Sequence, residues 1–520
     1  MDTLPLRVTR SSIAGVFSPR RAMAVQFLRA AAILVFHFFA ISSPPSFAAT
    51  NVSLSYQLRY DSAAPSMVVV SIRFPVPTDA PLTLIMPRSI PGGYAQRPYD
   101  PFVAKVKAYS ATGDAVEVRR EELGPRWTLG RRGENVTRIE YEVEVARMER
   151  EIFAASDSSK IRDGYVGLLG YSVFAFVDGW ENRPIDLAAA VPMAWPVFST
   201  LDPQVPAATG TLSVHATDYY ALADSQIMMG PKLELRKIEG GVPLFVSAYS
   251  ESADDLAQEG ALARDALDKT ISYFDKAPFT YYTVVLEFLK PVSLRHEYNF
   301  CMEHLNSGTF YMDVDHALTP KSTDLEKENH RFNYAHHIAH SWIPKHAYGA
   351  GYFPFTWEMT PVIDTIWFNE GFGRYVAIAA LADALPKEEA VRYRQEKLER
   401  LRRVTAEAPG FIQRMRLDEL SREGSFLYAG DFRVGMNLFA RGALMAGEMD
   451  DRIREQTSGR KSLRDALRHL MEWSEQNHHA FRIEELPVIF REATGVDTAS
   501  VLDRWMQPPV KSPVPHSAVR

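Results

Sequence analysis

Residues 334–375 read YAHHIAHSWIPKHAYGAGYFPFTWEMTPVIDTIWFNEGFGRY. His336 and His340 in this stretch are four residues apart, a spacing that places both side chains on one face of an α-helix. Glu370 follows thirty residues after His340. Two imidazoles and one carboxylate, with the fourth position left open, are the ligand pattern of catalytic zinc sites. The stretch therefore predicts a zinc site that consists of His336, His340 and Glu370.

Two helices are expected to carry these ligands. Residues 323–326 have the pattern of a capping box that opens the first helix. An apolar stripe follows over residues 332–342, and Pro344 ends the helix. A second helix is predicted over residues 364–380 and carries Glu370.

The residue after the first histidine departs from the usual zinc peptidase motif, His-Glu-x-x-His. The glutamate of that motif takes a proton from the attacking water. Here the position is occupied by His337, about 100° around the helix from its neighbours. The metal ligands are therefore retained, whereas the usual general base is not.

Further segments along the chain support one family resemblance. They are MPRSIPGGY at 86–94, LADS at 222–225 with Gly230, Met302-Glu303-His304, RIR at 452–454 and KSL at 461–463. In this order and spacing, with Asn-Glu-Gly-Phe around Glu370, the chain resembles the glycyl aminopeptidase family of zinc metallopeptidases, which are gluzincins. The resemblance runs from about Ser53 to Gln507.

The resemblance implies roles for two further residues. In related aminopeptidases a glutamate at the position of Glu303 binds the free α-amine of the substrate, a task that suits a carboxylate because it pairs with an ammonium group. A structural carboxylate on an edge strand is the alternative for Glu303. His304 is a second candidate for substrate binding. The loop at Gly92-Gly93-Tyr94 either is a plain turn or projects towards the site.

A second departure from the family lies near residue 440. Gluzincins carry a tyrosine in Tyr-x-Lys-Gly, whose hydroxyl steadies the oxyanion. The matching residues here are Phe439-Ala440-Arg441-Gly442, so the hydroxyl is absent. Loss of one such donor typically costs about 100- to 1000-fold in rate. Tyr428 is near in sequence, but the sequence does not place it in space.

The resemblance implies an α+β multidomain fold. Residues 50–252 are predicted to form an N-terminal β domain, residues 253–385 a thermolysin-like catalytic domain, and residues 386–508 a helical domain. Alternating residues such as Ile139, Tyr141 and Val143 indicate half-buried strands in the first of these. Residues 509–520 are expected to be a disordered tail. No PDZ domain, which many relatives carry at this end, is expected.

The N-terminal 49 residues are predicted to be a signal peptide. Basic residues precede an apolar run at 30–40 that is too short to span a bilayer comfortably, and Ser46-Phe47-Ala48 offers a cleavage site. The protein is then periplasmic or secreted, with no stable membrane span after cleavage. An uncleaved anchor or an N-terminal artefact is the alternative, and either Met1 or Met23 is the true start.

Composition excludes several other classes. The net charge of −6 over 520 residues is mild, and no basic block indicates nucleic acid binding. A single cysteine, Cys301, excludes an intramolecular disulfide. The expected partners are peptides or proteins with a free N-terminus.

Three functions remain open. The first is a metallopeptidase-family protein that keeps zinc and a peptide pocket, but whose hydrolysis is weakened or lost through His337 and Phe439. The second is an active zinc aminopeptidase with His337 as general base, since histidine has an unperturbed pKa near 6.5. The third is a peptide-binding or interaction protein without metal.

Overall fold

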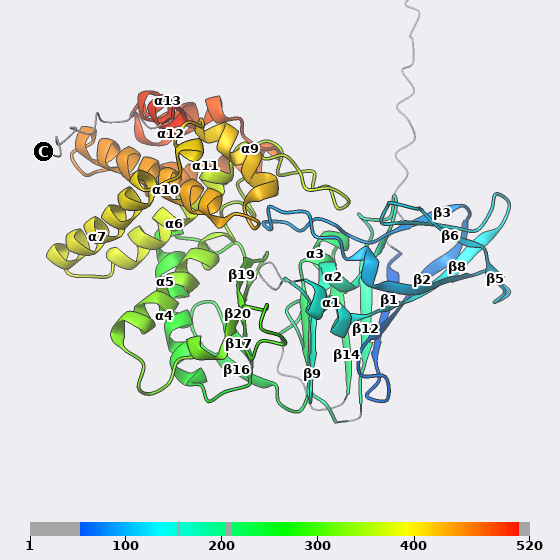
Figure 1. The fold of residues 1–520 in the computed structure, drawn as a ribbon. Helices are drawn as coiled ribbons and strands as arrows, with labels where there is room; N and C mark the ends of the chain where they lie inside the picture. The colour runs from blue at the N-terminus through cyan, green and yellow to red at the C-terminus, as the bar shows by residue number, and fades with distance from the viewer. Residues whose placement is uncertain (1–51, 153–156, 193, 204–209, 509–520) are drawn as a thin grey trace, which may run out of the picture. The chain divides into compact units, whose positions relative to one another are not determined.

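The computed structural model describes residues 52–152, 157–192, 194–203 and 210–508 (Figure 1). The predicted signal peptide and the predicted tail lie outside these residues. Within the described part of the chain, no helix combines the length and the apolar character that a membrane crossing requires.

The first part of the chain consists mainly of β-sheet. A seven-stranded sheet has the order β14-β12-β1-β2-β8-β4-β5. Its strands are β1 (Leu54–Tyr60), β2 (Val68–Asp79), β4 (Val103–Tyr109), β5 (Ala115–Val116), β8 (Asn135–Val143), β12 (Ile185–Ala190) and β14 (Thr211–Ala216). In β8 the predicted alternation is confirmed, because Ile139, Tyr141 and Val143 are fully buried while their neighbours are not.

Two four-stranded sheets and short helices complete this part. One sheet has the order β13-β15-β10-β9 and the other β11-β3-β7-β6. Their strands are β3 (Leu82–Ile85), β6 (Val118–Arg120), β7 (Arg126–Leu129), β9 (Lys160–Arg162), β10 (Tyr165–Leu169), β11 (Phe176–Val177), β13 (Val197–Ser199) and β15 (Gln226–Met229). The helices are η1 (Asp100–Phe102), α1 (Val145–Glu151), α2 (Gly170–Val173) and α3 (Tyr219–Ala223).

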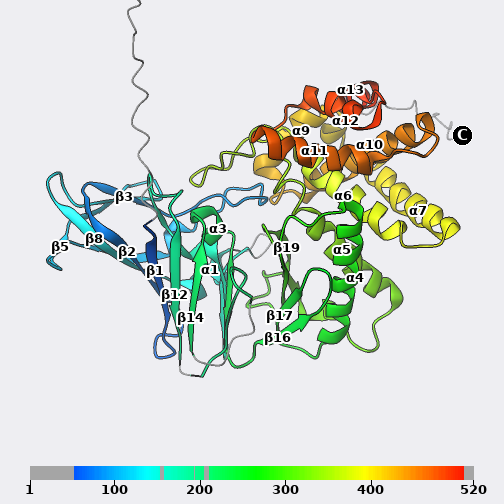
Figure 2. The ribbon, with the colours of Figure 1, turned by 180° about the vertical axis from the view of Figure 1, so that it is seen from behind.

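A five-stranded sheet follows, in the order β16-β17-β18-β20-β19. Its strands are β16 (Glu234–Ile238), β17 (Leu244–Ser250), β18 (Tyr282–Leu289), β19 (Asn299–Glu303) and β20 (Ser307–Asp313). Helices α4 (Leu256–Phe274) and α5 (Asp324–Ala339) lie against this sheet (Figures 1 and 2). Strand β19 is antiparallel to β20 and lies at the edge, so its outer backbone groups pair with no other strand of this sheet.

Helix α5 begins as the sequence predicts. The Thr323 hydroxyl accepts from the Glu326 backbone N–H at 3.3 Å, and the Glu326 carboxylate accepts from the Thr323 N–H at 2.6 Å. This reciprocal capping box fixes the first turn of the helix that carries both histidines.

The rest of the chain is helical. Its helices are η3 (Val314–His316), α6 (Ile366–Ala382), α7 (Lys387–Ala406), α8 (Gly410–Gln413), α9 (Leu417–Leu427), α10 (Phe432–Gln456), α11 (Leu463–Asn477), η4 (Ile483–Glu485), α12 (Leu486–Thr494) and α13 (Ala499–Met506). Beta sheets thus come first and helices last, which confirms the predicted α+β organisation. The thermolysin-like character of the middle part stays a prediction.

The buried apolar residues form two clusters. One fills the N-terminal sheets and extends to one face of the five-stranded sheet through residues such as Val285 and Tyr311. The other joins the opposite face of that sheet to the helices as far as Met506. The five-stranded sheet begins at Glu234, ahead of the predicted limit at 252, because β16 pairs with β17 and β17 pairs with β18. The predicted domain limits themselves stay predictions.

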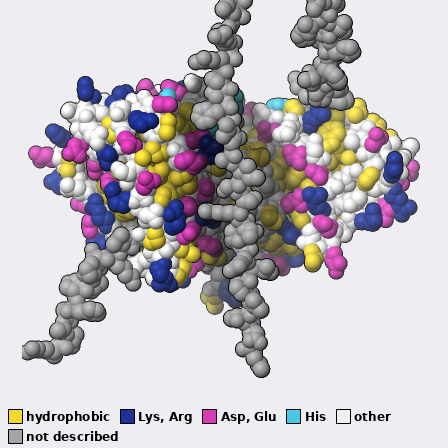
Figure 3. Space-filling model, turned by 90° about the horizontal axis from the view of Figure 1, so that it is seen from above, with side chains coloured by type: hydrophobic (Ala, Val, Ile, Leu, Met, Phe, Trp, Pro, Cys, Tyr) yellow, Lys and Arg dark blue, Asp and Glu magenta, His cyan; other side chains and the backbone are white. Residues whose placement is uncertain are grey.

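The molecular surface carries both signs of charge. On the face that Figure 3 shows, Lys and Arg side chains are interspersed with Asp and Glu side chains. Mixed charges of this kind are those of an ordinary solvated protein surface.

Helices α6 and α10 approach each other to backbone contact. A Cβ atom added to Gly371 would lie 2.4 Å from the Gly442 Cα atom, and one added to Gly442 would lie 2.0 Å from the Trp367 carbonyl oxygen. Both distances are shorter than any real Cβ contact, so this crossing requires glycine on both helices. The crossing holds Glu370 beside the segment of α10 that contains Phe439.

We therefore expect Gly442→Ala to lower the free energy of unfolding by at least about 1–3 kcal/mol, the usual cost of overpacking. Gly241→Ala is the matched control, because its added Cβ would meet no atom within 4 Å. That control should stay within about 0.5 kcal/mol of the wild type. Equal unfolding curves for the two variants in urea would contradict the close crossing.

Candidate metal centre

The three predicted ligands come together. The Nε2 atoms of His336 and His340 lie 3.3 Å apart. An oxygen of Glu370 lies 3.7 Å from His336 Nε2 and 3.5 Å from His340 Nε2. All three side chains are buried. The donors of a tetrahedral zinc ion, each about 2.0–2.1 Å from the metal, are about 3.3–3.4 Å apart, so this triangle fits zinc.

The chain orients the ring of His340. Its Nδ1 lies 2.8 Å from the carbonyl oxygen of Ile343. A carbonyl oxygen only accepts, so Nδ1 carries a hydrogen, and Nε2 is the nitrogen that faces the ligand cluster. Gly373 on α6 leaves room for the ring, because a Cβ added there would lie 3.1 Å from His340 Cε1.

The electrostatics of the cluster favour a cation. Burial lowers the pKa of His336 to about 4, which keeps this imidazole neutral. Burial also opposes charge on His340, but the carboxylates of Glu303 and Glu370 raise its pKa to about 9. Burial would raise the pKa of Glu370, but the two imidazoles lower it. A proton therefore rests on His340 between two carboxylates, where a divalent cation would satisfy the same charges.

His337 lies at the rim of the cluster. Its ring centre is 5.0 Å from that of His336 and 5.8 Å from that of His340. Burial and these two imidazoles lower the pKa of His337 well below its usual value. Its Nδ1 has no hydrogen-bond partner among the described residues and lies 3.9 Å from a carboxylate oxygen of Glu303.

Glu303 lies at the end of edge strand β19 and is reached by a loop of the N-terminal part. A Cβ added to Gly92 would lie 2.2 Å from Glu303 Oε1, and Gly92 has a φ of +89°, so only glycine fits there. Two residues on, the Tyr94 hydroxyl accepts from Asn369 Nδ2 at 3.0 Å. Of the two readings of this loop, projection towards the site is confirmed.

The carboxylate of Glu303 is buried and under-satisfied. It is 3% exposed, and its Oε1 has no hydrogen-bond partner among the described residues. Burial raises its pKa to about 7, with His340 opposing and Glu370 adding to the shift. A buried carboxylate oxygen without a donor costs free energy, which a bound ammonium group would recover.

The ring of His304 is not brought into the cluster. Its Nδ1 lies 3.0 Å from Asp224, and its Nε2 lies 3.0 Å from the Thr309 hydroxyl. Asp224 also accepts from the Leu305 backbone N–H at 2.7 Å. Both ring nitrogens of His304 are therefore occupied, although its role stays a prediction.

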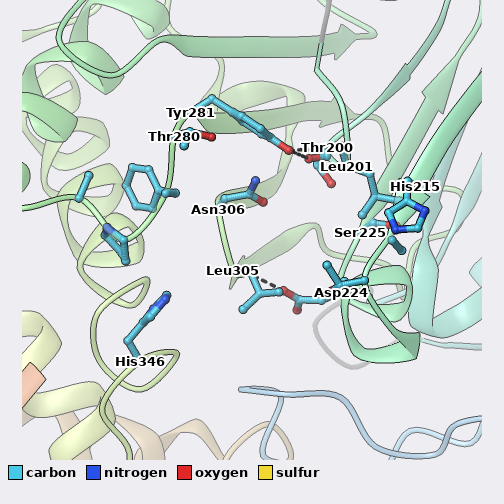
Figure 4. Close-up of a pocket in the computed structure, with 16 residues that line it drawn as sticks. Thr200, Leu201, His215, Asp224, Ser225, Thr280, Tyr281, Leu305, Asn306 and His346 are labelled. Atoms are coloured by element: carbon cyan, nitrogen blue, oxygen red, sulfur yellow. Dashed lines mark hydrogen bonds between the residues drawn. The ribbon is translucent and has the colours of Figure 1, made fainter. Parts of the chain in front are cut away.

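Asp224 also lines a separate pocket of about 560 Å³ (Figure 4). The lining includes His215 and Tyr281, and it contains none of the residues of the metal cluster. The 222–225 motif thus fastens the end of β19 rather than facing the metal ligands.

Phe439 packs beside the metal ligands, with its ring centre 5.3 Å from that of His336. A hydroxyl-bearing ring lies next to it, because the Tyr428 ring centre is 6.0 Å from that of Phe439 and 5.2 Å from that of Tyr94. Gly435 makes room for this ring, since a Cβ added there would lie 2.9 Å from Tyr428 Cε2.

The Tyr428 hydroxyl remains a proton donor. Burial and the charges of Glu370 and Glu303 raise its pKa well above the usual value. Sequence reasoning could not place this residue, because the contact joins the end of α9 to α10. In the sequence, Gly435, one helical turn before Phe439, is the residue that indicates space for a neighbouring ring on this face of α10.

One segment of the chain matches a known protein family. Residues 55–231 match the family model described as the Peptidase M61 N-terminal domain. No curated protein sequence is significantly similar to the chain. The finer resemblance to glycyl aminopeptidases stays a prediction.

Solved structures share the fold. An aminopeptidase N family protein from Idiomarina loihiensis has a TM-score of 0.75 at 19% identity, covering 88% of this chain and 77% of that one. An M1 zinc metallopeptidase from Deinococcus radiodurans has a TM-score of 0.51 at 15% identity, covering 89% and 96% respectively. Likeness at these identities shows the fold alone.

Metal analysis tests the ligand cluster. We expect purified protein to retain about one zinc ion per chain after dialysis, measured by mass spectrometry of the metal. His340→Ala removes one of three ligands and should abolish retention. His469→Ala, on the partly exposed face of α11, is the control and should retain the ion. Zinc-free wild type in the presence of micromolar zinc would contradict the assignment.

Proposed function

We propose that this chain is a zinc-binding protein of the aminopeptidase type, with weakened hydrolysis of the first peptide bond of its substrate. The observation that carries the proposal is the buried triangle of His336, His340 and Glu370, whose edges match those of a zinc tetrahedron. The match of residues 55–231 to a peptidase domain and the metallopeptidase fold support it.

His336, His340 and Glu370 would hold the metal. When bound, zinc supplies a Lewis acid that polarises the scissile carbonyl and activates water. Glu303 would bind the free α-amine, because its unpartnered, buried oxygen suits an ammonium group. Gly92 and Tyr94 close the amine end of the site, so they favour peptides with an unblocked N-terminus.

Under this proposal, two features slow the hydrolysis of the peptide bond. The position of the usual glutamate base carries His337, whose lowered pKa makes it a poor proton acceptor. Phe439 has no hydroxyl for the oxyanion. Tyr428, packed against Phe439, is the side chain that would supply a replacement donor.

One observation favours the alternative of an active aminopeptidase. His337 Nδ1 is unpartnered among the described residues and lies 3.9 Å from the Glu303 carboxylate. A carboxylate in this place would stabilise the imidazolium formed when His337 accepts a proton. Turnover that depends on His337 would favour this alternative over a binding protein.

The first test restores the two altered positions. A general base contributes about 100- to 10,000-fold, and one oxyanion donor about 100- to 1000-fold. We expect the double variant His337→Glu, Phe439→Tyr to release N-terminal residues from short peptides faster than the product of the single effects predicts, because such residues act as a unit.

His336→Ala is the control for that experiment and should abolish turnover. A double variant that is folded, contains zinc and cleaves no peptide with a free N-terminus would contradict weakened hydrolysis. That result would favour a peptide-binding protein on this scaffold.

The second test addresses Tyr428. We expect Tyr428→Phe to lower kcat by about 10- to 100-fold with little change in KM, because the lost hydroxyl acts on the transition state. Tyr281→Phe is the control, since its hydroxyl bonds the Thr200 carbonyl oxygen in the separate pocket. Equal kcat values for wild type and Tyr428→Phe would exclude the hydroxyl from the reaction.

A further inference from the structure

A cavity of about 390 Å³ begins one helical turn from the metal ligands. Its lining includes Asn333, three residues before His336 on α5, and Arg374, four residues after Glu370 on α6. Residues at these spacings are neighbours on one helix face. The cavity therefore runs along helices α5 and α6 from about one turn beyond the candidate ligands, none of which is among its lining residues.

Arg374 contributes a cation without a counter-ion to this cavity. Its guanidinium carbon lies 5.0 Å from the ring centre of Phe332 and 5.3 Å from that of Phe439. It makes no ion pair and no hydrogen bond with any described residue. Burial and nearby Arg400 lower its pKa to about 10, so it is still charged at neutral pH. Two rings thus hold a guanidinium whose N–H donors meet no protein acceptor among the described residues.

The charges around Arg374 keep this end of the cavity positive. Lys397 and Arg400 on α7 line the same cavity, and Lys397 is 3.7 Å from Glu328. Two carboxylates, Asp315 and Glu326, also line it. Glu326 serves the capping box at the start of α5, about 15 Å along the helix from His336.

The direction of strand β19 and the distance from His336 to Arg374 both suit a bound peptide. Strand β19 runs from Asn299, which lines the cavity, to Glu303, the candidate anchor of the amine. A peptide that is held at Glu303 and pairs antiparallel with the free edge of β19 would extend towards the cavity. The guanidinium of Arg374 is 5.3 Å from the Phe439 ring, and that ring is 5.3 Å from His336, so at most about 11 Å separates them. One extended residue spans about 3.5 Å.

We infer that Arg374, with Lys397 and Arg400 beside it, binds a carboxylate of the substrate one or two residues beyond the cleaved bond. The inference rests on the proposed function and narrows its substrates to peptides that carry a carboxylate one or two residues beyond the cleaved bond. The carboxylate is either the C-terminus of a dipeptide or tripeptide, or an aspartate or glutamate side chain. Arginine matches a carboxylate through two parallel hydrogen bonds.

Binding of uncleavable peptides tests this site. The probe is an Ala-Ala analogue with a CH₂ group in place of the cleavable NH, prepared as free acid and as C-terminal amide. Isothermal titration with zinc-loaded wild type should give about 10- to 100-fold tighter binding of the acid, as expected for a charged hydrogen bond. Arg374→Gln should abolish that difference, and Arg374→Lys should retain part of it.

Arg402→Gln is the matched control, because Arg402 lies on the exposed side of α7 and pairs with Glu399. This variant should keep the wild-type preference, and thermal unfolding should verify that all variants are folded. A second pair of analogues, amidated and ending in Glu or Gln, identifies the source of the carboxylate. Preference for the Glu analogue alone assigns the site to an acidic side chain.

The zinc content of the same samples separates this inference from the proposed function. Zinc-loaded protein that binds acid and amide alike in both pairs overturns the carboxylate site only. An acid preference that persists in Arg374→Gln also overturns it. If the protein contains no zinc but still binds the free-acid analogue more tightly through Arg374, only the proposed function is overturned. If it retains neither zinc nor peptide, the proposed function and the carboxylate site are both overturned.

Discussion

The backbone contact between α6 and α10 is the constraint on which the candidate site depends. Glu370 directly precedes Gly371 on α6, and Phe439 lies one turn before Gly442 on α10. The contact between the two glycines therefore fixes the distance from the candidate ligand Glu370 to the ring of Phe439. A side chain at either glycine would separate the helices. The ligand triangle would then lose the oxygen that α6 supplies.

Charge compensation is the second determinant of the site. Two carboxylates and three imidazoles are buried in one small volume, where an uncompensated charge is costly. The histidine pair alone would be an ordinary polar patch. The carboxylates of Glu303 and Glu370 turn it into a place that requires a positive charge, and zinc meets that requirement with geometry as well as charge.

The ring of Phe439 joins the candidate metal site to the neighbouring cation. It packs on one side of the Arg374 guanidinium and on His336. Under the proposed function, this ring would hold a substrate-binding cation instead of supplying a hydroxyl to the oxyanion. Tyr428, at the end of α9, also packs against the Phe439 ring, because Gly435 leaves space for the tyrosine ring.

The sequence by itself predicted the candidate ligand trio, and it determined both helices that carry these residues, the capping box of α5 and the general order of sheets before helices. These features depend on local spacing and periodicity, which the linear order of residues contains. Only the tertiary structure decided that the Gly92 loop reaches Glu303, that Asp224 occupies His304, that Tyr428 packs on Phe439, and that Arg374 lines the neighbouring cavity. Each of these contacts joins segments far apart in the chain or on different helices. Their distances follow from how helices and sheets pack, and no periodicity in the sequence encodes that packing.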